Sequence, residues 1–212
     1  MTPTPYAVLD LHFSPHDPTL LCVAASTGLV ELYRFDPATC QLRLESSAQL
    51  LDPLILVLSL AWHPTKANLI GITASSGEVY LCDLSKPDDE ALAEIQKHSL
   101  EAWTLSFSPC GASVYSGGDD AALNFSENVL RADDDEGGLG IQWSDRRAHG
   151  AGVTAILPLA HEDNVTVTGS YDDNIRVIRT PLMGRREVLA EENLEGGVWR
   201  LKMLREEPAR GR

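Results

Sequence analysis

One short pattern recurs along the chain and constrains its fold more than any other feature. The segments VLDLHFSP (8–15), VLSLAWHP (57–64) and AWTLSFSP (102–109) alternate apolar and polar residues and end at a proline. VTAILPLA (153–160) is a looser fourth copy, and VWRLKML (198–204) begins a fifth. Alternation with a period of two predicts a half-buried β-strand that ends in a turn.

A second apolar strand, a turn rich in Gly, Ser and Asp, and a third strand follow each of the first four copies. Taking Thr27, Ser76, Asp119 and Asp172 as equivalent turn positions gives a repeat of about 43 to 53 residues, near the roughly 40 to 45 of a propeller blade. Radial stacking buries both faces of such sheets and leaves only short, protected edges. We therefore predict an all-β propeller, in which 88–103 fits an exposed fourth strand about as well as a helix.

The 212 residues are predicted to form one domain, because all-β folds commonly reach this length undivided. The predicted blades cover 6–50, 55–100, 101–148 and 149–195, and 196–204 starts the next blade.

The charge balance and the apolar runs exclude several classes of partner. The chain has 17 basic and 31 acidic residues, a formal charge of −14, which repels phosphate backbones and anionic lipid. The longest apolar run, LILVLSLAW (54–62), is far shorter than the roughly 20 residues of a membrane helix, and the N-terminus does not resemble a secretory signal. We expect a cytoplasmic protein that binds neither nucleic acid nor membrane.

The cysteines and histidines show no metal-binding spacing. No CxxC or HExxH pattern occurs in the sequence, so we expect no metal site and no disulfide framework. The interpretation of the cysteines is buried, reduced thiols. They are Cys22, Cys40, Cys82 and Cys110.

The turns and third strands resemble those of WD-repeat proteins. The family pattern of S-x-D, an aliphatic residue and an aromatic residue is matched by one set of four positions and approximated by a second. His149-Gly150 matches the Gly-His step that opens a WD blade, while the family tryptophan is missing from every copy. The two sets are Ser170, Asp172, Ile175, Ile178 and Gly117, Asp119, Ala122, Phe125.

A narrower resemblance rests on three consecutive motifs. H-x-x-G-V-T-A-I (149–156), TGSYDDNIRV (168–177) and GGVWRLK (196–202) are together similar to the WD-repeat diphthine methyl ester hydrolases, also called diphthine methyltransferases. The resemblance implies a closed propeller of about seven blades. This chain would then be a truncated form with four blades and the first strand of a fifth. An acidic, Gly-rich insertion at 126–140 departs from the family pattern.

The resemblance also implies an activity. A member of this family is expected to be a carboxylic ester hydrolase of diphthamide biosynthesis, which removes the methyl ester from the modified histidine of translation elongation factor 2 without a cofactor. The alternative is a non-catalytic WD-repeat adaptor that binds proteins on its rim. Degenerate blades and the absence of a G-x-S-x-G nucleophile favour the adaptor, and the pairing of GSYDD with GGVWR favours the enzyme.

Ester hydrolysis needs an activated water or nucleophile, a base and donors for the oxyanion. The catalytic hypothesis is that Asp172 or Asp173 assists the attack of water while Arg200 stabilises the developing charge. For Asp172 the competing interpretation is a turn carboxylate that accepts hydrogen bonds from backbone amides.

The remaining candidate residues divide into two groups. The first would bind substrate at the propeller mouth, where loops gather and Gly196-Gly197 predicts a close backbone approach. The second would hold the blade turns. The substrate-binding candidates are Tyr171, Trp199 and Asp120, and the structural ones are Ser170, Asp119 and His149.

Overall fold

The computed structural model describes residues 5–127, 140–160 and 164–204. These residues form β-strands β1 to β16, arranged as four antiparallel sheets of four strands each. Most of the acidic, Gly-rich insertion at 126–140 lies outside the described residues.

The four sheets are built in the same way, each from four strands that follow one another along the chain. The first sheet contains β1 (Val8–Phe13), β2 (Leu20–Ala25), β3 (Leu29–Asp36) and β4 (Gln41–Gln49). The second contains β5 (Val57–Trp62), β6 (Leu69–Ala74), β7 (Glu78–Asp83) and β8 (Leu92–Lys97). The third contains β9 (Ala102–Phe107), β10 (Ser113–Gly118), β11 (Leu123–Glu127) and β12 (Gln142–Asp145). The fourth contains β13 (Val153–Pro158), β14 (Val165–Ser170), β15 (Asn174–Arg179) and β16 (Glu187–Asn193).

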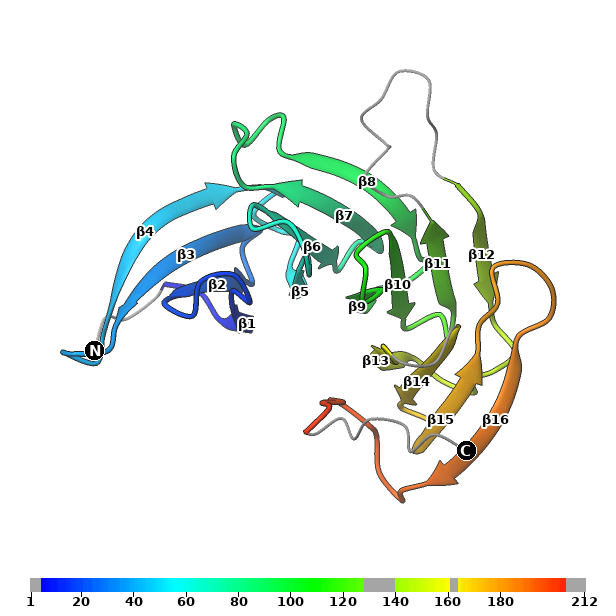
Figure 1. The fold of residues 1–212 in the computed structure, drawn as a ribbon. Coiled ribbons are helices and arrows are strands. Elements are labelled where there is room, and N and C mark those ends of the chain that lie inside the picture. Colours follow the sequence, from blue (N-terminus) through cyan, green and yellow to red (C-terminus); the bar gives the residue numbers. More distant parts are fainter. Residues whose placement is uncertain (1–4, 128–139, 161–163, 205–212) are drawn as a thin grey trace.

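The sheets fan around a common axis as propeller blades (Figure 1). β1, β5, β9 and β13 lie innermost, and β4, β8, β12 and β16 form the outer rim (Figure 1). The predicted β-propeller with four blades is confirmed. The segment that was compatible with a helix or a fourth strand contains strand β8.

Burial within a blade follows from this stacking. Every residue of β6 and β10 is buried, because both faces of these strands are covered by neighbouring blades. Every residue of β16 is exposed, since it lies at the rim of the fourth blade. The second strands therefore read as continuous apolar or small-residue runs, and the outer strands as polar ones.

Glycines on the second strands set the distance between neighbouring blades. A Cβ added to Gly117 would lie 2.6 Å from the carbonyl oxygen of Val153 on the next blade. A Cβ added to Gly169 would lie 2.4 Å from a methyl carbon of Val198. Val198 thus packs on β14 as Val153 packs on β10, so the chain after β16 takes the position of the next inner strand at this residue.

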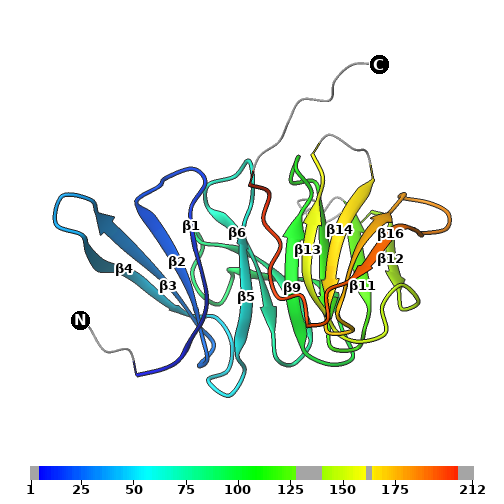
Figure 2. The same ribbon diagram turned by 90° about the horizontal axis from the view of Figure 1, so that it is seen from below.

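Residues 194–204 nevertheless form no strand. The Val198 amide donates to the Ser170 carbonyl (3.1 Å), and Thr154 Oγ1 donates to the Val198 carbonyl. Figure 2 shows this segment rising beside β13 and β9 on the inner side of the blades. The fourth blade thus anchors it through backbone contacts at Val198 rather than through a ladder.

The prediction of buried, reduced thiols is correct for two cysteines and wrong for the other two. Cys22 and Cys82 are buried on β2 and β7, and burial raises the pKa of the Cys82 thiol to about 12. Cys40 and Cys110 are exposed because each lies in a turn between strands. All four thiols are free.

The part of the chain that the structure describes has neither a membrane-spanning helix nor a metal-binding cluster. Within 5–127, 140–160 and 164–204, no helix is long and apolar enough to cross a membrane. The same residues contain no group of three or more His, Cys, Asp or Glu side chains placed to hold a metal ion.

The contact at Gly117 gives a first prediction. Gly117→Ala should lower the free energy of unfolding by about 1 to 3 kcal/mol, because the new methyl group overlaps Val153 and forces the third and fourth blades apart. Chemical denaturation measures the change. Gly196→Ala is the matched control, since a Cβ at Gly196 would meet nothing within 4 Å. Equal stability of the two variants would contradict this packing.

Candidate functional site

The turn between the second and third strands of each blade has the same backbone shape. One residue in each turn lies in the left-handed region: Gly28 (φ 71°), Gly77 (φ 99°), Ala121 (φ 58°) and Asp173 (φ 67°). The residues directly before them are therefore equivalent: Thr27, Ser76, Asp120 and Asp172. The structure places Asp120, rather than the predicted Asp119, at the position of Asp172.

Asp120 joins the turn of the third blade to the loop that enters this blade. Its carboxylate accepts hydrogen bonds from the Ser99 amide (3.0 Å) and the Ala122 amide (3.2 Å) and contacts His98 Nδ1 (2.9 Å). Arg146 donates to it as well (3.0 Å). Burial alone would raise the pKa of Asp120, but these donors hold it below its ordinary value.

Asp172 has the same role in the fourth blade. It accepts from the Gly150 amide (2.7 Å) in the entering loop and from the Asn174 amide (3.1 Å) in its own turn. Arg176 forms an ion pair with it at 2.8 Å. Burial opposes ionisation, but the donors prevail and lower the pKa of Asp172. We call Asp120 and Asp172 the turn carboxylates.

The two predicted structural partners in the fourth blade are buried. Ser170 Oγ donates to the Ala151 carbonyl (3.0 Å) and accepts from the Asp172 amide (3.1 Å), so this hydroxyl is fully engaged. His149 was predicted to pair with an aspartate, yet its Nε2 hydrogen-bonds to Thr168 Oγ1 (2.9 Å), while its Nδ1 has no partner within the described part of the chain.

Sequence reasoning missed the corresponding histidine of the third blade. His98 is buried, contacts Asp120, and hydrogen-bonds through Nε2 to Ser116 Oγ (2.7 Å). It lies four positions before the first residue of β9, as His149 lies four positions before the first residue of β13, and Ser116 corresponds to Thr168. His98 lies directly before Ser99, whose amide donates to Asp120. No glycine follows His98, so the Gly-His step that identifies His149 in the sequence is missing here.

The predicted substrate-binding residues Tyr171 and Trp199 meet beside the inner strand β9. Their ring centroids are 4.9 Å apart, with the planes at 85°. Both side chains are exposed, and Trp103 of β9 contacts both rings. Asp119 is exposed beside them and accepts a hydrogen bond from Trp103 Nε1 (3.3 Å). Trp103 was not among the predicted site residues.

The predicted catalytic residues lie in different surroundings. Arg200 reaches across to the first blade and donates to Asp10 Oδ1 (2.7 Å). Asp10 is buried and also accepts from Ser59 Oγ (3.0 Å). Burial opposes ionisation of Asp10, but contacts from His12, Leu60 and Arg200 lower its pKa to about 2. Within the described residues, no contact joins Arg200 to Asp172 or Asp173.

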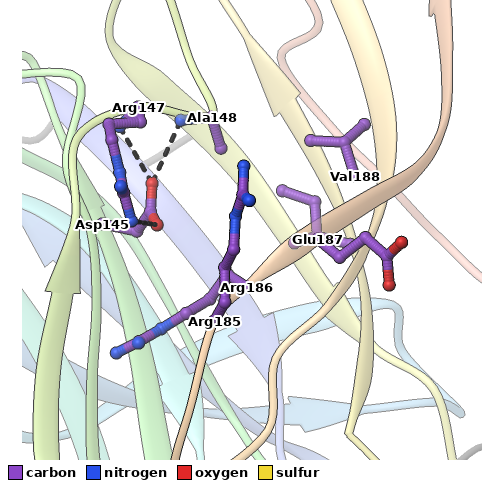
Figure 3. A pocket seen from close by; sticks show the side chains of 8 residues that line it. Asp145, Arg147, Ala148, Arg185, Arg186, Glu187 and Val188 are labelled. Carbon is purple, nitrogen blue, oxygen red and sulfur yellow. Dashed lines mark hydrogen bonds and ion pairs between the residues drawn. The ribbon is translucent and has the colours of Figure 1, made fainter.

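Two cavities differ in chemistry and place. One, of about 290 Å³, lies on the inner side of the blades and is lined by residues of β1, β5, β9 and β13 together with Trp199 and Arg200. A larger one, of about 620 Å³, lies between Asp145 at the end of β12 and Glu187 at the start of β16 (Figure 3). Arg147, Arg185 and Arg186 line the larger cavity, whereas the predicted site residues do not. The inner cavity is therefore the one that adjoins the candidate site.

The comparisons with known proteins agree with this architecture. Residues 90–125 match the family model described as WD domain, G-beta repeat. A chain in the crystal structure of the mitotic checkpoint complex superposes with a TM-score of 0.71 at 20% identity, over 94% of this chain and 55% of that one. This likeness shows the fold alone.

Sequence relatives point to a narrower group. Diphthine methyltransferase of Schizosaccharomyces pombe is 34% identical over 93% of this chain and 57% of its own length. The protein of the same name from Saccharomyces cerevisiae is 29% identical over 92% of this chain and 62% of its own length. The human protein of that name is 30% identical over 92% and 44%. The chain thus spans about half the length of the curated relatives it matches.

The placement of the two neighbouring aspartates gives a second prediction. Asp120→Asn should lower the free energy of unfolding by about 2 to 4 kcal/mol, because buried His98 and the backbone amides around this buried side chain lose a charged acceptor. Asp119→Asn is the matched control and should change stability by less than about 0.5 kcal/mol, since that side chain is exposed. Thermal unfolding of both variants measures the difference. A larger loss of stability in Asp119→Asn than in Asp120→Asn would show that Asp119 is the residue at the turn position.

Burial of His149 gives a third prediction. Burial and then the nearby Arg176 lower the pKa of His149 to about 4, whereas the unfolded chain titrates near pH 6.5. Between these values only the unfolded state binds the proton, so stability is complete above about pH 6.5 and falls as the pH drops towards 4, by about 3 kcal/mol. His98 and His63 act in the same direction, because burial lowers both pKa values.

In His149→Gln the unfolding free energy should depend less steeply on pH in this range, by the equivalent of about one bound proton. Urea denaturation at several pH values measures it. A slope identical to that of the wild-type chain would show that His149 is not buried in its neutral form.

Proposed function

Because this chain is a WD-repeat homologue of the diphthine methyltransferases, we propose that it acts in diphthamide biosynthesis. The reaction proposed is hydrolysis of the methyl ester on the modified histidine of elongation factor 2, in the cytoplasm. The observation that carries the proposal is similarity to proteins of that name along more than nine-tenths of the chain. Since the chain spans about half of their length, the proposal concerns the contribution of these four blades.

The geometry narrows the choice between the two candidate carboxylates. Both oxygens of Asp172 already bind donors, and its lowered pKa makes it a weak base. Asp173 has no side-chain hydrogen bond among the described residues, and its backbone carbonyl is held by the Leu194 amide (2.8 Å). We therefore assign the assisting role to Asp173 and the positioning role to Asp172.

The proposed reaction consumes one water molecule and releases methanol. Asp173 accepts a proton from water while the water oxygen bonds to the ester carbonyl carbon. The tetrahedral intermediate then releases methanol, and the proton passes to the leaving methoxide. Arg200 is the proposed cationic group for the oxyanion, at the inner cavity where its guanidinium now pairs with Asp10.

A non-catalytic adaptor is the second candidate function. It is favoured by the full engagement of Ser170, Asp120 and Asp172 in holding turns, which leaves no preassembled nucleophile and base within the described residues. Exposed aromatic residues on a rim are also typical of protein-binding surfaces.

The test of the function is a turnover measurement, which gives a fourth prediction. The purified chain is incubated with elongation factor 2 that carries the methyl ester, and the modified histidine should lose the mass of one methylene group. Asp173→Asn should slow this loss by about a hundredfold, the usual contribution of a general base. Mass spectrometry of the modified peptide measures both rates.

Asp89→Asn, at an exposed position in the β7–β8 loop, is the matched control and should leave the rate unchanged. Binding of elongation factor 2 without any mass loss by a folded chain would favour the adaptor. Full activity of a folded Asp173→Asn protein would remove Asp173 from the mechanism.

A further inference from the structure

The cavity between the third and fourth blades carries three arginines and lies away from the candidate site. It has a volume of about 620 Å³ and lies between the end of β12 and the start of β16, the outer strands of these blades (Figure 3). The residues of the proposed hydrolytic step do not line it, so the proposed function does not account for this cavity. Its charged lining residues are Arg147, Arg185, Arg186, Asp145 and Glu187.

Both carboxylates of this cavity are already engaged. Asp145 Oδ1 accepts hydrogen bonds from the backbone amides of Arg147 (2.9 Å) and Ala148 (3.0 Å). Glu187 forms an ion pair with Arg179 at 3.0 Å, outside the set of lining arginines. The Arg147 guanidinium approaches Asp145 Oδ2 only to 3.9 Å. The carboxylates therefore neutralise little of the positive charge in the cavity.

The three cavity arginines differ in this respect from most arginines of the protein. Within the described residues, Arg185 and Arg186 have no carboxylate partner, although the chain has 31 acidic and only 17 basic residues. Five arginines elsewhere in that part of the chain each have a carboxylate oxygen within 3.0 Å. They are Arg34, Arg146, Arg176, Arg179 and Arg200. The cavity is thus a local positive patch on an acidic protein.

An aromatic stack positions Arg186. Its guanidinium carbon lies 4.2 Å from the centroid of the Trp143 ring, over the ring face. That ring stacks in turn on Phe125, with centroids 5.1 Å apart and planes at 12°. Arg186 Nη1 also donates to the Gly184 carbonyl (2.7 Å). Because the side chain is already positioned, it loses little conformational freedom when it binds a ligand.

The other donors of Arg186 form the edge of the guanidinium that binds oxyanions. Nε is buried, and neither Nε nor Nη2 has an acceptor within the described residues. A buried donor without an acceptor is costly. Two oxygens of one oxyanion can pair with the adjacent Nε and Nη2 hydrogens in a bidentate contact. An oxyanion that reaches Nη2 can therefore supply the acceptor that Nε lacks.

We propose that Arg147, Arg185 and Arg186 bind a phosphate monoester. Near pH 7 such a group carries a charge of about −1.5 to −2 and has three strong acceptor oxygens, so it matches three guanidinium groups better than a single carboxylate does. The organic part of the ester can contact three apolar side chains that line the same cavity: Ala148, Ile178 and Val188.

The acidic surface elsewhere limits the ligand to one phosphate group. Charges are screened beyond about 8 to 10 Å at physiological ionic strength, so a phosphate in the cavity interacts mainly with the three arginines. A nucleic-acid backbone would extend over the rest of a chain with a formal charge of −14 and would be repelled. A phosphorylated side chain of a polypeptide and a small phosphate ester share the required chemistry, and their affinities distinguish them.

The test compares ligands by isothermal titration calorimetry on the purified chain at constant ionic strength. A short peptide with one phosphoserine should bind at least about tenfold more tightly than the same peptide with serine, and at least about threefold more tightly than the same peptide with glutamate. Free phosphoserine is measured beside them. Tighter binding of the phosphopeptide than of phosphoserine supports a polypeptide as the source of the phosphate, and equal binding supports a small ester.

Variants assign the binding to the cavity arginines. Arg186→Gln should weaken phosphopeptide binding at least about tenfold, and Arg186→Lys, which keeps the charge but loses the bidentate edge, about fivefold. Arg185→Gln should weaken it about threefold, and this exposed position is expected to tolerate the change. Arg43→Gln is the matched control, because Arg43 is exposed on β4 of the first blade and its loss changes the net charge equally. Thermal unfolding verifies that each variant is folded.

Three results would overturn the proposal. Equal affinity for the phosphoserine and serine peptides would show that the arginines do not recognise phosphate. Tighter binding of the glutamate peptide, or of a single-stranded oligonucleotide, than of the phosphoserine peptide would assign the cavity to carboxylates or to nucleic-acid backbones. Unchanged phosphopeptide affinity in folded Arg186→Gln and Arg185→Gln proteins would place the phosphate elsewhere.

Discussion

The hydrogen bonding of two carboxylates to backbone amides is the interaction on which the described site depends. Asp120 and Asp172 each join a hairpin turn to the loop that enters the same blade. In the third and fourth blades these connections add to the face-to-face packing between neighbouring blades. The carboxylates stay ionised because several donors together outweigh the cost of burial.

The positions of the residues next to the turn carboxylates follow from this arrangement. Since the carboxylates fix the turns, the residues directly before them, Asp119 and Tyr171, are held in place just after β10 and β14. Trp103 and Trp199 reach the same place from equivalent positions on β9 and on the segment after β16, with β13 between them in the chain. A structural repeat thus brings side chains that are distant in sequence together at one place.

The sequence predicts the architecture well because hydrophobic alternation, turn residues and repeat length all report the same blade. It predicts the site less well. SGGDD offers two adjacent aspartates, and only the left-handed backbone at Ala121 shows that Asp120 is the one in the turn. Trp103 reads as an ordinary strand residue, because its partners Tyr171 and Trp199 are distant in sequence. Contacts across blades, including the pair Arg200 and Asp10, have no local sequence signal at all.

The turn carboxylates hold the loops that enter the third and fourth blades and so order the residues beside them. The most direct measurement is amide hydrogen exchange at the backbone groups that donate to them, those of Ser99, Ala122, Gly150 and Asn174. All lie outside strand ladders or at their ends, where exchange is otherwise fast. We expect protection comparable to that of the neighbouring strands. Exchange as fast as in exposed loops would contradict the claim.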